Sequence, residues 1–143
     1  MQQDIRKEPG PDHPITIEPC RERMRAAFER HVIADTEDCL ILREADYPPV
    51  YYFPMEDVDM SFMSKSPQAS HCPYKGDASY WTIYMDGVIA ENAGWSYDDP
   101  YPSAAALKGR IAFYPDKLEV YAVDERDLQR GPVTGTDLGH STP

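Results

Sequence analysis

The feature that most constrains this chain is a turn signal roughly every eight to twelve residues between short apolar runs. The clearest is Asp86-Gly87, which separates the alternating run 80–85 from the apolar run 88–90. An Asp-Gly pair between two such runs is a strong hairpin signal, because both residues tolerate the left-handed backbone of a tight turn. Runs this short favour antiparallel strands over long helices.

Other apolar runs of strand length are expected to form strands, namely 15–17 as an edge strand, 39–43, 50–53, 110–114 and 118–123. The last two are expected to pair about Pro115-Asp116-Lys117 as a second hairpin. One helix is expected over 102–109, since Pro102 suits a first turn and Gly109 an end.

The stretches between these runs are expected to be irregular. Residues 55–63 are expected to hold a helical turn and then a brief strand, and 95–100 to be a loop. At least six short strands against one short helix predict a mainly β fold, a small single domain of antiparallel sheets.

Residues 21–35 allow two interpretations. Met24, Ala27, Phe28, His31 and Val32 recur at helical spacing, which favours an amphipathic helix. The β-branched run after His31 instead allows two strands joined at 29–31. Periodicity alone leaves both open.

The length of 143 residues fits one domain with a real core. Residues 1–19 are polar and rich in proline, which predicts an extended N-terminal arm. Residues 20–123 form the β-rich domain, and 124–143, rich in Gly, Pro and Thr, are expected to be a flexible C-terminal tail.

The formal net charge of −11 makes nucleic acid an unexpected partner, because an acidic body repels the phosphate backbone. No run approaches the roughly 18 apolar residues of a membrane span, so no membrane contact is expected. Three cysteines without CxxC spacing or a secretory leader predict a cytoplasmic protein with reduced thiols. The sequence indicates no cofactor and leaves the oligomeric state undetermined.

The segment SHCPYKGDASYW, residues 70–81, is the densest in chemically active side chains. His71, Cys72 and Lys75 are the candidate catalytic residues. A thiolate needs a base or cation nearby, which His71 or Lys75 can supply, although a free cysteine is more often a small buried hydrophobe. Adjacent residues on an extended chain point to opposite faces, so His71 and Cys72 are not expected to share a metal ion, and no metal site is expected.

Ligand binding without covalent chemistry is the third possibility. The ammonium of Lys75 lies beside Gly76, where the backbone can approach a ligand closely. The candidate ligand-binding residues are a carboxylate, this glycine and four aromatic rings suited to stacking: Glu44, Gly76, Tyr52, Trp81, Trp95 and Tyr97.

Five segments resemble the bacterial domain-of-unknown-function family 427, in its order and spacing: HPITIEP, ADTEDCLILRE, YPPVYYFPMEDV, SHCPYKGDASYW and AGWSYDDPYPSAAALKGRIAFYPDKLEV. The resemblance implies a tent-like pair of antiparallel sheets with a helix. It also implies a strand–turn–strand over 21–35, although this chain lacks the turn glycines common there.

The activity of that family is unknown, and its occasional nucleotidyltransferase label fits the residues poorly. Such an enzyme needs a glycine-rich phosphate loop before its metal-binding carboxylates. Asp57 and Asp59 have the spacing of a carboxylate pair, but no Gly-Ser or Gly-Gly precedes them.

The working hypothesis is a protein that binds a small polar or planar ligand in an aromatic- and His/Lys-lined cleft. If the protein is an enzyme, His71 or Lys75 is the expected acid/base group. The alternative is a non-enzymatic protein-interaction module that uses the same aromatic surface.

Overall fold

The computed structural model describes residues 6–124. In that range it contains ten strands and three short 3₁₀ helices: β1 (Ile15–Pro19), β2 (Met24–Phe28), β3 (His31–Thr36), β4 (Leu40–Glu44), β5 (Val50–Pro54), η1 (Met55–Asp57), η2 (Met60–Phe62), β6 (Met63–Cys72), β7 (Gly76–Met85), β8 (Val88–Ser96), η3 (Pro102–Leu107), β9 (Arg110–Phe113) and β10 (Glu119–Ala122). The expected C-terminal tail lies outside the described residues, apart from Asp124.

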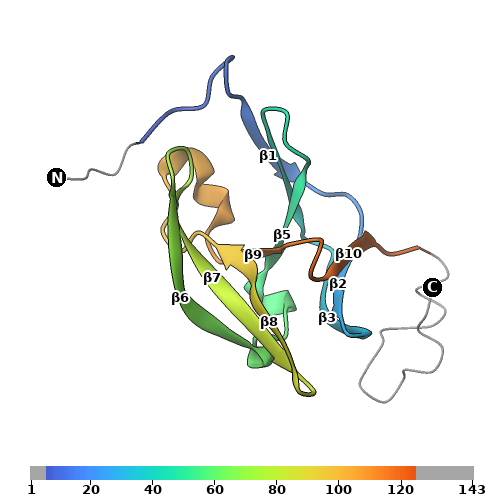
Figure 1. Cartoon of the computed structure of the whole chain (residues 1–143). Helices are drawn as coiled ribbons and strands as arrows, with labels where there is room; N and C mark the ends of the chain where they lie inside the picture. Colours follow the sequence, from blue (N-terminus) through green and yellow to red (C-terminus); the bar gives the residue numbers. More distant parts are fainter. Residues whose placement is uncertain (1–5, 125–143) are drawn as a thin grey trace.

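The strands form two antiparallel sheets. The larger has the order β1-β4-β5-β9-β8-β7-β6 and the smaller the order β10-β2-β3. Figure 1 shows the smaller sheet at the right, beside the large sheet, and the coil of η3 at the upper left near β6 and β7. The expected fold class, mainly β with antiparallel sheets in one small domain, is confirmed, and so is the edge strand at the N-terminus, β1.

Two hairpins have the tight turns that two-residue connections require. Asp86 and Gly87 join β7 to β8 with φ of +52° and +81°, as the sequence predicted. Glu29 and Arg30 join β2 to β3 with φ of +50° and +69°. Two consecutive positive φ values match the right-handed twist of the strands, so this turn forms without the usual glycines. Residues 21–35 are therefore a hairpin and not a helix.

The large sheet buries side chains on both faces. One face packs against the small sheet in a core that includes Phe53 and Ile111, which pair between β5 and β9. The opposite face carries a second core, in which Tyr52 and Ala112 pack with Leu107 of η3. Successive residues of a strand point to opposite faces, so one run such as 51–53 serves both cores.

The expected second hairpin, 110–114 with 118–123, is wrong. β9 pairs with β5 and β8, while β10 pairs with β2 of the other sheet. Both edges of β9 are therefore occupied. After the turn, Leu118 enters the core between the sheets, and the chain crosses from one sheet to the other.

Three further expectations need correction. Trp95 and Ser96 belong to β8 and not to a loop, because Trp95 pairs with both Tyr80 and Ala112. The brief strand expected near residue 63 is the ten-residue β6, which ends at Cys72. The expected helix is η3, two 3₁₀ turns merged across a kink at Ala104.

Candidate functional site

A cleft of about 240 Å³ opens on the face of the large sheet that carries η3. Its lining combines one ion pair with aromatic and apolar side chains: Leu42, Glu44, Tyr47, Pro48, Val50, Tyr52, Lys75, Tyr80, Trp95, Tyr97 and Tyr114. The cleft is slightly smaller than the roughly 300–1,000 Å³ typical of drug-sized ligand pockets, so its size suits a small molecule.

The charged end of the cleft is assembled from three distant segments. Glu44 ends β4, where it pairs in register with Ile15 of β1. That pairing places His13, just before β1, against Glu44 at 2.7 Å. Lys75, in the turn between β6 and β7, binds the other carboxylate oxygen of Glu44. Its carbonyl accepts a hydrogen bond of 2.9 Å from the N–H of Tyr101, which holds this turn in place.

The ion pair is shielded from solvent, with 9% of the Lys75 side chain and 12% of the Glu44 side chain exposed. Burial by itself raises the pKa of Glu44. The hydrogen bonds from Lys75 and His13 and their charges outweigh burial and hold this pKa below its usual range. Glu44 is therefore a carboxylate at neutral pH, and both of its oxygens are engaged.

Aromatic rings form the walls. The indole N–H of Trp95 donates to the hydroxyl of Tyr52 at 3.1 Å, and the two rings meet edge to face at 6.3 Å. Tyr114 also packs against Trp95, with ring centroids 4.5 Å apart. The ammonium of Lys75 lies 5.8 Å from the ring centroid of Tyr97, a distance at which a cation is attracted by the ring face.

Burial keeps the phenols of the cleft protonated. It raises the pKa of Tyr52 and of Tyr97 well above the usual range. Burial, and then the neighbouring Tyr80, raise the pKa of Tyr114 to about 12. At neutral pH these hydroxyls are neutral groups that can donate a hydrogen bond.

Five of the nine predicted site residues line this cleft: Glu44, Tyr52, Lys75, Trp95 and Tyr97. The other four lie elsewhere. His71 is near the end of β6, where its Nδ1 contacts Asp77 at 2.7 Å and its Nε2 lies 3.4 Å from the hydroxyl of Tyr101. Cys72, a free thiol, packs against the core beneath the cleft.

Gly76 and Trp81 make contacts within the protein. Gly76 has φ of +114°, and a Cβ there would lie 3.4 Å from the carbonyl oxygen of Asp99, so the backbone that approaches it is the chain's own loop. Trp81 lies on the opposite face of the sheet from Trp95, packs against the core between the sheets, and donates its indole N–H to Ser96 at 2.9 Å.

Sequence reasoning missed several residues of the site: His13, Tyr47, Pro48, Tyr80 and Tyr114. His13 had one usable signal, because it begins HPITIEP, a segment that carries the family resemblance. Its ring stacks on Tyr74, with centroids 4.0 Å apart. A contact across 31 residues between His13 and Glu44 depends on strand pairing and has no local pattern.

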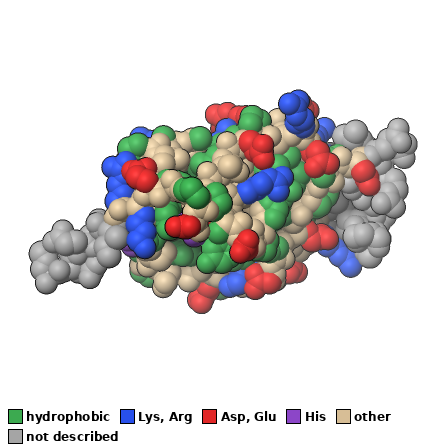
Figure 2. All heavy atoms as spheres, turned by 90° about the horizontal axis from the view of Figure 1, so that it is seen from above, with side chains coloured by type: hydrophobic (Ala, Val, Ile, Leu, Met, Phe, Trp, Pro, Cys, Tyr) green, Lys and Arg blue, Asp and Glu red, His purple; other side chains and the backbone are tan. Residues whose placement is uncertain are grey.

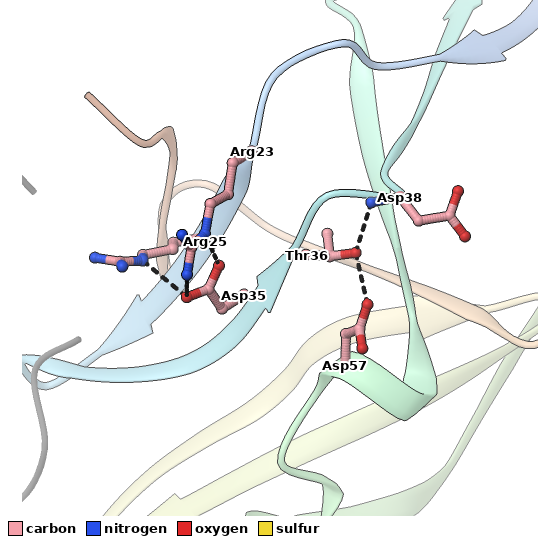
Figure 3. A network of polar contacts seen from close by, with 6 residues as sticks. All are labelled: Arg23, Arg25, Asp35, Thr36, Asp38 and Asp57. Atoms are coloured by element: carbon pink, nitrogen blue, oxygen red, sulfur yellow. Dashed lines mark hydrogen bonds and ion pairs between the residues drawn. The ribbon is translucent and has the colours of Figure 1, made fainter. Parts of the chain in front are cut away.

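A second polar cluster lies on the small sheet and beside it (Figure 3). Asp35 accepts two hydrogen bonds from Arg23 and one from Arg25, which hold its pKa below the usual range although burial alone raises it. Thr36 donates to Asp57 at 2.7 Å. Asp59 accepts from the N–H of Ser61, so both carboxylates of the Asp57/Asp59 pair bind the protein itself.

Among residues 6–124, no group of three or more His, Cys, Asp or Glu side chains is placed to hold a metal ion. No helix in that range is long and apolar enough to cross a membrane. On the face shown in Figure 2, acidic and basic side chains are interspersed with apolar ones.

Comparison with known protein families identifies the family of this chain. The profile of a domain of unknown function, DUF427, matches residues 16–124. The chain belongs to the DUF427 family. The match covers most of the chain and includes every residue that lines the cleft. It also includes all ten strands, except for the first residue of β1. No curated protein matches the chain.

Proposed function

We propose that this DUF427 protein binds a small planar, polar molecule in the cleft above Glu44 and Lys75. The observation that carries the proposal is a nearly buried Lys–Glu pair at the end of a concave, aromatic-walled hollow. Ligand sites are typically apolar hollows with a few well-placed polar groups, and this cleft has that composition.

The concave position of the aromatic rings favours a small ligand over a protein partner. Tyr52 is 1% exposed and Tyr97 is 6% exposed, so neither ring offers a flat surface to another protein. Of the three candidate catalytic residues, Lys75 lines the cleft, whereas His71 and Cys72 do not. An acid/base step on the bound molecule would therefore fall to Lys75 and its partner Glu44.

The test is a thermal-shift screen of a metabolite library on the wild type, Lys75→Met and Lys65→Met. Lys65 is the matched control, because it lies over Trp81, on the other face of the sheet from the cleft, and its side chain is 49% exposed. A ligand at one hundred times its Kd stabilises the protein by about 2.7 kcal/mol through mass action.

A cleft ligand should raise the Tm of the wild type and of Lys65→Met, and shift Lys75→Met much less. A compound that shifts all three proteins equally binds elsewhere. If no compound in a broad library discriminates Lys75→Met from the control, the proposed function is wrong.

A further inference from the structure

The hydroxyl of Tyr97 has no partner within the described part of the protein. Tyr97 is 94% buried, since 6% of it is exposed, and no hydrogen bond to its hydroxyl is formed by residues 6–124. Within that range, the one side-chain N or O atom that is both sealed from solvent and unpaired is Nη2 of Arg25. The Tyr97 hydroxyl therefore still reaches solvent, and Tyr97 is one of the residues that line the cleft.

Two other residues that line the same cleft, Lys75 and Tyr52, also carry donors. The ammonium of Lys75 carries three N–H donors, and in the described residues it has one hydrogen-bonded partner, Oε1 of Glu44. The oxygen of Tyr52 accepts the indole N–H of Trp95, and among residues 6–124 no acceptor takes its phenolic proton, which can therefore be donated.

The acceptors of the cleft that carry no proton of their own, the two oxygens of Glu44, are in contrast already engaged. One oxygen of Glu44 is bound by Lys75 and the other by His13. The hydroxyl of Tyr80 is paired with Ser70 at 2.8 Å. The cleft therefore offers more free donors than free carboxylate acceptors, and a molecule that supplies acceptor oxygens complements it.

We propose that the cleft selects a planar molecule that presents carboxylate or carbonyl oxygens to the Tyr97 hydroxyl and the Lys75 ammonium. This inference rests on the proposed function and adds the chemical class of the ligand. The flat part of the molecule packs against the aromatic walls, and the donors form hydrogen bonds to its oxygens. Engagement of both Glu44 oxygens limits the repulsion that a bound carboxylate would meet.

Three probes of one shape test the inference by isothermal titration: benzoate, benzamide and benzamidine. All share a benzene ring and a planar three-atom head group. Benzoate presents two acceptor oxygens, benzamide one, and benzamidine N–H donors on a cation. The protein has a net charge of −11, which favours the cationic benzamidine in any non-specific binding. Benzoate is expected to bind at least tenfold more tightly than benzamidine, with benzamide between them.

Tyr97→Phe removes the donor and little else. It is expected to weaken benzoate about tenfold, the effect of one hydrogen bond to a charged group. Its Tm should not fall, because the hydroxyl makes no hydrogen bond within the described protein. Tyr84→Phe is the matched control, since Tyr84 lies outside the cleft lining and is 58% exposed. It should leave benzoate binding unchanged.

Two results would overturn the inference: benzamidine binding as tightly as benzoate, or Tyr97→Phe binding benzoate like the wild type. If benzamidine binds more tightly than benzoate and Lys75→Met weakens benzamidine binding, the cleft is a ligand site and only the argument from its donors is wrong. If none of the three probes binds, the inference falls. The proposed function falls only when the library screen also finds no ligand that depends on Lys75.

Discussion

Removing either partner of the Glu44–Lys75 pair should destabilise the protein more than removing both. Lys75→Met leaves Glu44 with His13 as its remaining partner, and Glu44→Gln leaves a shielded ammonium without its counter-charge. The double variant removes both charges together. The free energies of unfolding of these three variants, compared with that of the wild type, therefore give the coupling energy between Glu44 and Lys75.

The magnitude follows from the burial of the two side chains. Breaking a fully buried ion pair by deleting one partner costs about 3–5 kcal/mol. The exposures of 9% for Lys75 and 12% for Glu44 are close to that limit. Because His13 still binds Glu44, Lys75→Met is expected to cost about 2–3 kcal/mol, and Glu44→Gln about 2–4 kcal/mol. Because the double variant is expected to lose less stability than either single variant, the coupling energy of the cycle exceeds the larger single loss and is at least about 3 kcal/mol.

The assay is urea unfolding followed by tryptophan fluorescence, with a second cycle as control. Arg43→Met and Glu18→Gln break an ion pair at 3.1 Å in which both side chains are more than half exposed. That cycle should give a coupling of about 0.2–1 kcal/mol. If the Glu44–Lys75 coupling does not exceed the control, the pair is not shielded as described and the reasoning is refuted.

The same pair makes the free energy of unfolding depend on pH in the acidic range. The pKa of Glu44 is lower in the folded protein than in the unfolded chain. Its contribution is therefore present above the unfolded pKa of about 4.3 and is lost as the pH falls through the folded value. The free energy of unfolding of Glu44→Gln should depend less on pH in this acidic range than that of the wild type.

Two further predictions concern the sheets. Gly94→Ala should destabilise the protein by about 1–3 kcal/mol in urea unfolding, because its Cβ would lie 2.9 Å from the carbonyl oxygen of Ala112. The control is Gly10→Ala, whose Cβ would have no atom within 4 Å and which should be nearly neutral. Equal losses of stability in the two variants would contradict the close packing at Gly94. Asp35→Asn should cost at least about 2 kcal/mol because Arg25, 1% exposed, loses its carboxylate partner. A change no larger than that of Asp38→Asn, whose side chain is 71% exposed, would show that Arg25 does not need this charge.

The sequence predicted local features better than long-range ones. The Asp86-Gly87 turn was recognisable because its backbone requirement is met by the two residues themselves. The partner of β10 was not, because a strand that follows a turn pairs with its predecessor only where an edge is free, and both edges of β9 are occupied. The hairpin at Glu29 and Arg30 needed the family resemblance, since its residues also recur at helical spacing.

The sequence by itself determined the β class, the family and a set of residues from which five line one cleft. Residue type and turn chemistry are local properties, so they can be read along the chain. Only the tertiary structure decided that Trp81 and Trp95 lie on opposite faces of the sheet. It also decided that His13 reaches Glu44 and that Tyr97, whose hydroxyl has no partner among residues 6–124, lines the cleft. These depend on strand register and burial, which arise when distant segments pack.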